Sequence, residues 1–277
     1  MPADIAPPGA FFLPATHGAR FCLQHSVAPD RPARGTILYI HPFGEELNCS
    51  RRIVARQCRA LAAGGWQVLQ IDLGGCGDSS GDLVEATIEG WRQDLRDALA
   101  WLGQRDGAQP VTLWGLRLGA LLALDLAASE PRINQLILWQ PVIDGAKFMG
   151  QFLRMGLAAD FDQVEPRSDL ASLRQHLAQR SALEIAGYNL GARLAREIEA
   201  LCVPTTVTVP VAWLQLGSSA TLVPASAKVI EQWRAAGASV LAECVPAPPF
   251  WSAPGYDQAD TLLTATTGAV DRMASWT

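Results

Sequence analysis

Short apolar runs alternate along this chain with longer stretches in which apolar and polar positions follow helical spacing. The runs are rich in β-branched and aromatic side chains, which is typical of strands buried in a sheet. Strands are predicted at residues 36–40, 66–71, 111–114, 133–139, 211–216 and 239–245. Helices are predicted between and after them, at 50–63, 87–104, 120–129, 225–236 and 258–275. Alternation of this kind indicates right-handed crossovers and a mostly parallel, doubly wound sheet of the α/β class.

Two regions depart from this alternation. Residues 11–13 and 20–25 predict an antiparallel amino-terminal hairpin. From 147 to about 201 the pattern is helical and predicts no strand. We therefore expect a core made of residues 1–146 and 202–277, with a helical cap inserted at 147–201.

Composition narrows the class of protein. Of the 277 residues, 49% are hydrophobic, enough to bury both faces of a parallel sheet, and the net charge of −5 argues against nucleic acid or an anionic membrane as a partner. No apolar stretch reaches the ~20 residues that cross a bilayer, and the Pro-rich start does not have the pattern of a signal peptide. The six cysteines lack C-x-x-C spacing. We therefore expect a cytoplasmic protein with reduced thiols, no metal and no cofactor.

Three glycine-containing motifs stand at the ends of predicted strands. His41-Pro42-Phe43-Gly44 follows the first parallel strand, and D-x-x-G-x-G-x-S runs from Asp72 to Ser79. Gly115-Leu116-Arg117-Leu118-Gly119 joins a strand to a helix of small residues. Together they resemble the α/β-hydrolase superfamily, where these positions hold an oxyanion-hole loop, a turn after the next strand, and the nucleophile elbow G-x-S-x-G. The resemblance implies an α/β-hydrolase fold with Arg117 in the place of the nucleophile.

A closer resemblance covers nearly the whole chain. It rests on the runs 41–52, 75–82 and 114–120 and on Pro249-Phe250-Trp251. These runs are similar to the second of two hydrolase-like families associated with the exosortase A system, which are encoded beside bacterial exopolysaccharide and PEP-CTERM sorting genes. The resemblance implies that setting but no particular reaction, because a fold does not determine a function.

The elbow serine of a hydrolase needs a histidine base and an acid that orients it. Arginine carries only donors and stays charged, so Arg117 can serve neither as nucleophile nor as general base. In the G-x-x-D pattern of the family acid, the acid position falls on Ala220. No histidine follows His176 in the sequence, so the position of the family histidine, after the last strand, holds a different residue. We expect the serine-hydrolase triad to be absent.

Four residues remain as weak candidates for relocated chemistry. His41 is the only histidine near the predicted site, and Ser79 and Cys76 lie on the neighbouring glycine-rich turn. Asp144 follows the strand that ends at 139, where some relatives carry their acid. Each has a plainer alternative: His41 completing local hydrogen bonds, the turn residues bonding to backbone, and Asp144 capping a helix.

Arg117 has two alternative roles. It could form an anion site together with the backbone N–H groups of Leu118 and of the Phe43-Gly44 loop, at the amino terminus of a helix. Alternatively it could fill the old catalytic cavity by pairing with Glu45 or Glu46, which we place on the adjacent loop. Both can hold if a ligand displaces the internal partner.

These considerations leave three hypotheses. The first is a catalytically altered hydrolase-fold protein that binds an anionic or acylated small molecule of exopolysaccharide or protein-sorting metabolism. The second is an atypical hydrolase or acyl transferase acting on esters or thioesters through His41 or a relocated nucleophile. The third is a non-catalytic partner protein that stabilises another enzyme of the pathway. For the assembly we expect either a homodimer or a complex with such a pathway protein.

Overall fold

A single eight-stranded sheet organises the molecule in the computed structural model, which describes residues 7–28, 32–107, 109–159, 170–255 and 258–276. The strand order is β1-β2-β4-β3-β5-β6-β9-β10. Strands β3 to β10 in this sheet are parallel, and β1 and β2 form the antiparallel hairpin at one edge. The strands are β1 Gly9–Ala15, β2 Gly18–His25, β3 Gly35–Ile40, β4 Trp66–Ile71, β5 Val111–Leu116, β6 Ile133–Trp139, β9 Val211–Leu216 and β10 Val240–Val245. The predicted sheet and hairpin are confirmed.

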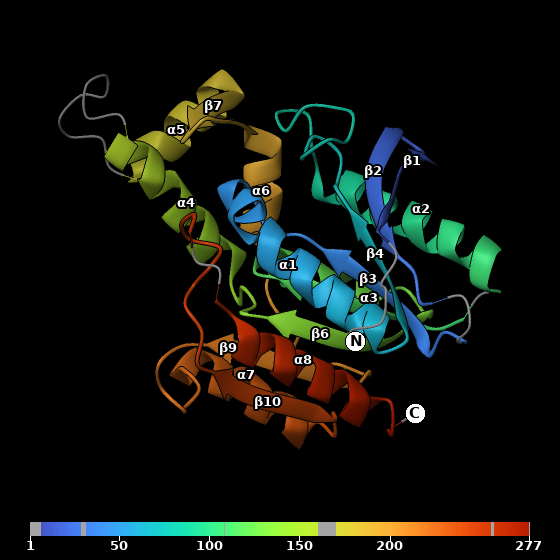
Figure 1. Cartoon of the computed structure of the whole chain (residues 1–277). Helices are drawn as coiled ribbons and strands as arrows, with labels where there is room; N and C mark the ends of the chain where they lie inside the picture. Colours follow the sequence, from blue (N-terminus) through green and yellow to red (C-terminus); the bar gives the residue numbers. More distant parts are fainter. Residues whose placement is uncertain (1–6, 29–31, 108, 160–169, 256–257, 277) are drawn as a thin grey trace.

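Helices cover both faces of this sheet (Figure 1). One apolar core joins the sheet to α2, α3 and α7, and a second joins the opposite face to α1 and α8. The helices of the core are α1 Glu45–Ala63, α2 Ile88–Asp106, α3 Leu118–Ala127, α7 Pro224–Ala235 and α8 Asp260–Met273. The central strand β5 is buried at every position, which explains its continuous apolar run.

The segment between β6 and β9 extends beyond the carboxyl ends of the strands (Figure 1). It contains α4 Gly145–Ala159, α5 Leu170–Arg180, α6 Ala192–Ala200 and a two-stranded antiparallel sheet of β7 Ala182–Ile185 and β8 Tyr188–Gly191. The prediction of a segment without strands was wrong here. The hairpin turns at Ala186 and Gly187, both at positive φ, and its strands are only four residues long. Strands this short carry too little alternation to be separated from helical spacing.

Helix α1 begins earlier than its predicted start at residue 50. Glu45 and Glu46 form its first turn, so they are helical and do not lie on the preceding loop. Carboxylates in a first turn interact favourably with the positive end of the helix dipole. Arg51 and Arg52, which a start at residue 50 would put in the first turn, therefore lie in the second turn.

Candidate functional site

The turn between β5 and α3 holds Arg117 in a strained backbone conformation. Its φ of 56° and ψ of −117° are rare for a residue with a side chain. Two backbone hydrogen bonds fix it: its N–H donates to the carbonyl of Trp139 at 3.0 Å, and its carbonyl accepts from Val142 N–H at 3.2 Å. The end of β6 therefore holds the turn, and the arginine side chain projects from the carboxyl edge of the sheet.

The two glycines of the elbow allow the helix to approach the strands closely. A Cβ on Gly115 would lie 2.4 Å from the carbonyl oxygen of Gly119, and a Cβ on Gly119 would lie 2.3 Å from that of Ile40. Both obstacles are backbone atoms, which cannot move without shifting an element. The spacing G-x-R-x-G thus satisfies a steric requirement that is independent of the residue at its centre.

Arg117 is anchored at one nitrogen. Its Nε donates to Glu46 Oε1 at 3.1 Å, and the two side chains are 18% and 21% exposed. Within the described residues, the two terminal nitrogens of Arg117 make no hydrogen bond. The guanidinium carbon lies 5.4 Å from the ring centre of Trp251 and 5.9 Å from that of Phe148, within range of cation–π attraction. The fork is therefore positioned, with donors to spare.

The two neighbouring carboxylates have different roles. Burial raises the pKa of Glu46, and the charge of Arg117 opposes that rise. Glu46 Oε2 is buried and has no hydrogen-bond partner among the described residues. Glu45 faces the hairpin β7–β8 instead: Tyr188 of β8 donates to its Oε2 at 2.8 Å, and Asn48 of α1 donates to the same oxygen at 3.0 Å. Of the two predicted partners, the structure pairs Arg117 with Glu46.

The loop before α1 supplies the second side of the site. Gly44 caps the helix at φ 59° and ψ −135°, a conformation that favours glycine. The ring of Phe43 packs edge-on against Phe152 of α4 at 4.9 Å. Neither Phe43 N–H nor Leu118 N–H donates to an acceptor within the described part of the chain. Gly119 packs against the carbonyls of Ile40 and His41, so this loop and the start of α3 are adjacent.

The positions expected for an acid and a histidine carry other side chains. Ala220 is exposed on the loop after β9. Trp251 follows β10 and lies against the Arg117 guanidinium, in the region where the resemblance leads us to expect a histidine. Sequence reasoning considered Trp251 only as part of a motif, because nothing local indicates that its ring would face the elbow.

His41 makes two hydrogen bonds to backbone. Its Nδ1 lies 2.7 Å from the carbonyl oxygen of Pro42, and its Nε2 accepts from Leu73 N–H at 3.1 Å. Burial lowers the pKa of His41, which favours the neutral ring. Both ring nitrogens thus contact backbone groups, which agrees with the alternative that His41 completes local hydrogen bonds.

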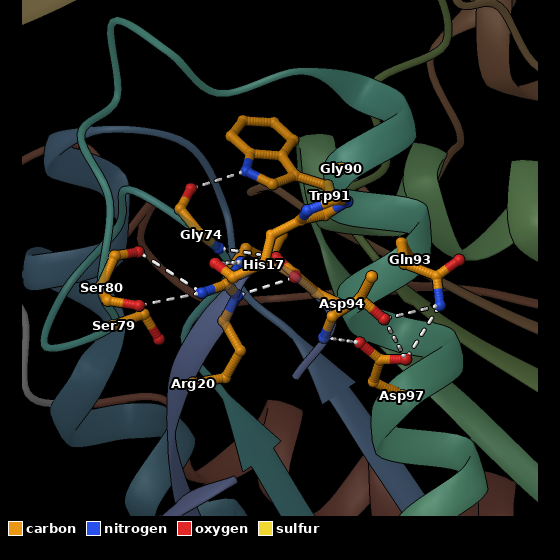
Figure 2. Close-up of polar contacts among 12 residues, drawn as sticks. His17, Arg20, Gly74, Ser79, Ser80, Gly90, Trp91, Gln93, Asp94 and Asp97 are labelled. Carbon is orange, nitrogen blue, oxygen red and sulfur yellow. Dashed lines mark hydrogen bonds and ion pairs between the residues drawn. The ribbon is translucent and has the colours of Figure 1, made fainter. Parts of the chain in front are cut away.

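The glycine-rich turn is tied to the amino-terminal hairpin and to α2 (Figure 2). Ser79 Oγ donates to the carbonyl of Asp72 and accepts from Phe21 N–H at 2.8 Å. Arg20 donates to the carbonyl of His17 at 3.1 Å, and its Nε lies 2.7 Å from Asp94 Oδ1. These contacts favour the structural reading of the turn. Sequence reasoning missed the Arg20–Asp94 pair, whose members are 74 positions apart.

Cys76 and Asp144 also have local explanations. Burial raises the pKa of the Cys76 thiol to about 12, so little thiolate forms at neutral pH. Asp144 Oδ1 accepts from Lys147 N–H at 2.9 Å at the start of α4, and this bond lowers its pKa. Arg51 forms an ion pair with Asp72 at 3.1 Å, so its charge is already balanced by a carboxylate outside the elbow.

Two cavities lie away from the elbow. One of about 520 Å³ is lined by the β1–β2 turn, the glycine-rich turn and the start of α2. Another of about 570 Å³ opens beside Gly35, Pro110 and Asn134, near the amino ends of β3, β5 and β6. Among the described residues no group of three or more His, Cys, Asp or Glu side chains could hold a metal ion. In the same part of the chain, no helix is both long and apolar enough to cross a membrane.

The strand order, the strained elbow and the loop beside it define a protein of the α/β-hydrolase class. The family described as "Serine aminopeptidase, S33" matches residues 31–202, and the chain belongs to this family. Protein ABHD12B of Homo sapiens is 35% identical over 97 residues, which are 35% of this chain and 25% of that protein. The chain therefore spans about a quarter of this relative's length. An uncharacterized protein of Rickettsia prowazekii is 28% identical over 169 residues, 58% of this chain and 69% of that protein.

Solved structures share the fold at low identity. Est1E from Butyrivibrio proteoclasticus, solved with ferulic acid, superposes with a TM-score of 0.70 at 18% identity, over 96% of this chain and all of that one. A soluble variant of monoglyceride lipase from Saccharomyces cerevisiae, in complex with a substrate analogue, gives 0.66 at 15% identity over 98% and 97% of the two chains. At these identities the likeness shows the fold alone.

Proposed function

We propose that this protein uses the hydrolase elbow to bind an anionic small molecule and does not run serine-hydrolase chemistry. The observation that carries the proposal is the state of the Arg117 side chain. Glu46 occupies its Nε, while its two terminal nitrogens make no hydrogen bond within the described residues. Arg117 is also the N-cap residue of α3, and the dipole at the start of a helix favours an anion.

The surroundings of the elbow support binding over catalysis. The nucleophile position holds an arginine, the acid position falls on Ala220, and Trp251 stands where a histidine would be expected. The polar side-chain atoms of His41 and Ser79 form hydrogen bonds with backbone groups. Neither of these two candidates is therefore free to act on a substrate in the described part of the chain.

The motifs around the elbow extend the proposal to a biological setting. The runs that resemble the second exosortase A-associated hydrolase-like family include the elbow and the Pro249-Phe250-Trp251 loop that packs on it. We therefore place the protein in that system, with a ligand drawn from exopolysaccharide or protein-sorting metabolism.

A ligand-stabilisation screen tests the anion site. Thermal unfolding is measured with carboxylates, acyl phosphates and nucleotides for the wild type, Arg117→Ala and Arg117→Lys. At least one anion should raise the Tm of the wild type, and Arg117→Ala should lose that shift entirely. A ligand that stabilises the wild type and Arg117→Ala equally contradicts the proposal.

An ester assay tests the catalytic alternative. Neither the wild type nor Arg117→Ser should hydrolyse p-nitrophenyl hexanoate above the uncatalysed rate, because a serine at the elbow still lacks a base. Turnover by the wild type that disappears in His41→Ala would favour an atypical hydrolase instead.

One observation favours a second candidate, a non-catalytic partner protein. The elbow is partly filled by its own aromatic side chains, Phe148 and Trp251, while the cavities of about 520 and 570 Å³ lie elsewhere. On this reading Arg117 and Glu46 close an abandoned site. Absence of any Arg117-dependent anion effect, together with a lower Tm of Arg117→Ala, would support it.

A further inference from the structure

We infer that the ligand of the elbow is a monocarboxylate with an apolar body, in preference to a phosphate ester. The inference rests on the proposed function and narrows it to a chemical class. Three features of the site lead to it: the donors left on Arg117, the charge available there, and the side chains that surround the guanidinium.

The free donors of Arg117 form a planar pair. Because Glu46 occupies Nε, the outer edge with the two terminal nitrogens is what remains for a ligand. Two N–H groups in one plane match the two oxygens of a carboxylate in a bidentate contact. A tetrahedral phosphate would have further oxygens to satisfy, and the elbow adds only the N–H groups of Leu118 and Phe43.

The charge at the site suits a monoanion. Within the described residues, Arg117 is the basic side chain that forms an ion pair with Glu46, and the Glu46 carboxyl is itself largely buried. Neighbouring basic side chains are already paired, Arg51 with Asp72 and Lys147 with Asp144. Because the ionised Arg117–Glu46 pair has no net charge, a bound monocarboxylate adds one negative charge and a phosphate dianion adds two. The dianion is therefore the more costly ligand at this half-buried position.

Aromatic rings surround the cation. Trp251 comes from the loop after β10 and Phe148 from α4, and Phe148 lies 6.1 Å from Phe43, whose ring also contacts Phe152. Covering an apolar chain with such rings is favourable, whereas moving a phosphate out of water against them is costly. The site therefore combines one charged contact with an apolar surface, as an acyl or aryl acid requires.

Three matched probes test the ligand class: hexanoate, hexyl phosphate and hexanamide. They share the same chain and differ in head group, so calorimetric affinities compare the head groups directly. Hexanoate should bind the wild type at least about tenfold more tightly than hexyl phosphate, and hexanamide should not bind measurably, because a planar charged pair is the strong contact. Arg117→Lys, which keeps the charge without the fork, should weaken hexanoate at least about tenfold.

A second comparison tests the apolar surface. Trp251→Leu should weaken hexanoate more than acetate, whereas Trp276→Leu, at an exposed tryptophan near the carboxyl terminus, should change neither. Circular dichroism and the Tm of each variant establish that it is folded. Equal losses for hexanoate and acetate in Trp251→Leu would contradict the apolar part of the inference.

The outcomes separate the inference from the proposal beneath it. If hexyl phosphate binds as tightly as hexanoate or more tightly, and Arg117→Ala abolishes both, the anion site stands and the ligand class is wrong. If hexanoate binds the wild type and Arg117→Ala equally, or no probe binds the wild type, the inference fails, and the broader screen decides the proposed function separately.

Discussion

The Arg117 side chain is fixed in place by Glu46 and still has donors that a ligand could use. The carboxylate takes the Nε edge of the guanidinium, and the rings of Trp251 and Phe148 lie beside it. An exposed arginine would lose several rotatable bonds of freedom on binding a ligand, whereas this one has already lost them on folding. Preorganisation of this kind is what a binding site needs from a residue that cannot act as a nucleophile.

His25 gives a prediction at the residue scale. Burial, with repulsion from Arg59, lowers the pKa of this histidine to about 4 from 6.5. Between pH 6.5 and pH 4, His25 binds a proton in the unfolded chain but stays neutral in the folded protein. The free energy of unfolding therefore falls as the pH drops from 6.5 to 4. The difference between a pKa of 6.5 in the unfolded chain and about 4 in the folded protein corresponds to about 3 kcal/mol in the free energy of unfolding. Urea unfolding of wild type and His25→Gln at pH 7 and pH 4.5 should show the variant losing less stability on acidification.

His176→Gln is the matched control for this measurement. His176 is exposed on α5, so its replacement should leave the pH dependence of the wild type unchanged. If His25→Gln loses as much stability as the wild type between the two pH values, the buried neutral histidine is not the source of the acid sensitivity.

At the scale of elements, the contact between α3 and the strand ends decides the shape of the elbow. Gly115 and Gly119 lie where any Cβ would meet backbone oxygens of neighbouring elements. The strained conformation of Arg117 persists because the end of β6 bonds its N–H and the loop after β6 bonds its carbonyl. The architecture of a nucleophile elbow is therefore complete although the residue at its centre is an arginine.

Substitution of these glycines tests the contact. Gly119→Ala should destabilise the fold by roughly 1–3 kcal/mol, because its Cβ would press on the carbonyls of Ile40 and His41. Gly268→Ala is the control: it lies in α8 with no atom within 4 Å of a new Cβ, and should stabilise by about 0.5–1 kcal/mol. Denaturant midpoints measure both, and opposite signs are expected. A neutral Gly119→Ala would mean that α3 can retreat from the strands.

At the scale of the whole molecule, long-range polar contacts join segments that the sheet alone leaves loosely connected. Arg20 and Asp94 are 3% and 1% exposed and link β2, the glycine-rich turn and α2 (Figure 2). Glu197 of α6 accepts from Ile88 N–H at 2.7 Å and so caps the start of α2. Tyr188 binds Glu45 beside the elbow. The segment above the sheet is therefore attached to the core at separate points.

The buried pair should matter far more than an exposed one. Asp94→Asn would leave the Arg20 charge buried without a counter-charge, and should cost about 3–5 kcal/mol. Asp271→Asn breaks the pair with Arg34, whose members are 50% and 43% exposed, and should cost less than about 1 kcal/mol. Urea unfolding at neutral pH measures both. Similar losses in the two variants would show that Arg20 finds other acceptors or water.

The sequence by itself determined the α/β-hydrolase class, the amino-terminal hairpin, the elbow at Arg117 and the absence of a histidine after His176. These follow from local periodicity and from motif spacing, which depend on residues close together in the chain. The short hairpin β7–β8 and the helical position of Glu46 were missed, because four-residue strands and a helix start without a side-chain cap leave weak local signals.

Only the tertiary structure decided which carboxylate pairs with Arg117, and which rings lie beside it. Glu46, Phe148 and Trp251 come from three segments that meet through packing across the sheet edge. Sequence reasoning could place Glu45 and Glu46 near the elbow, but their side chains diverge by helical geometry, one toward Arg117 and one toward Tyr188. Contacts of this kind depend on the relative placement of whole elements, and local pattern carries no information about that placement.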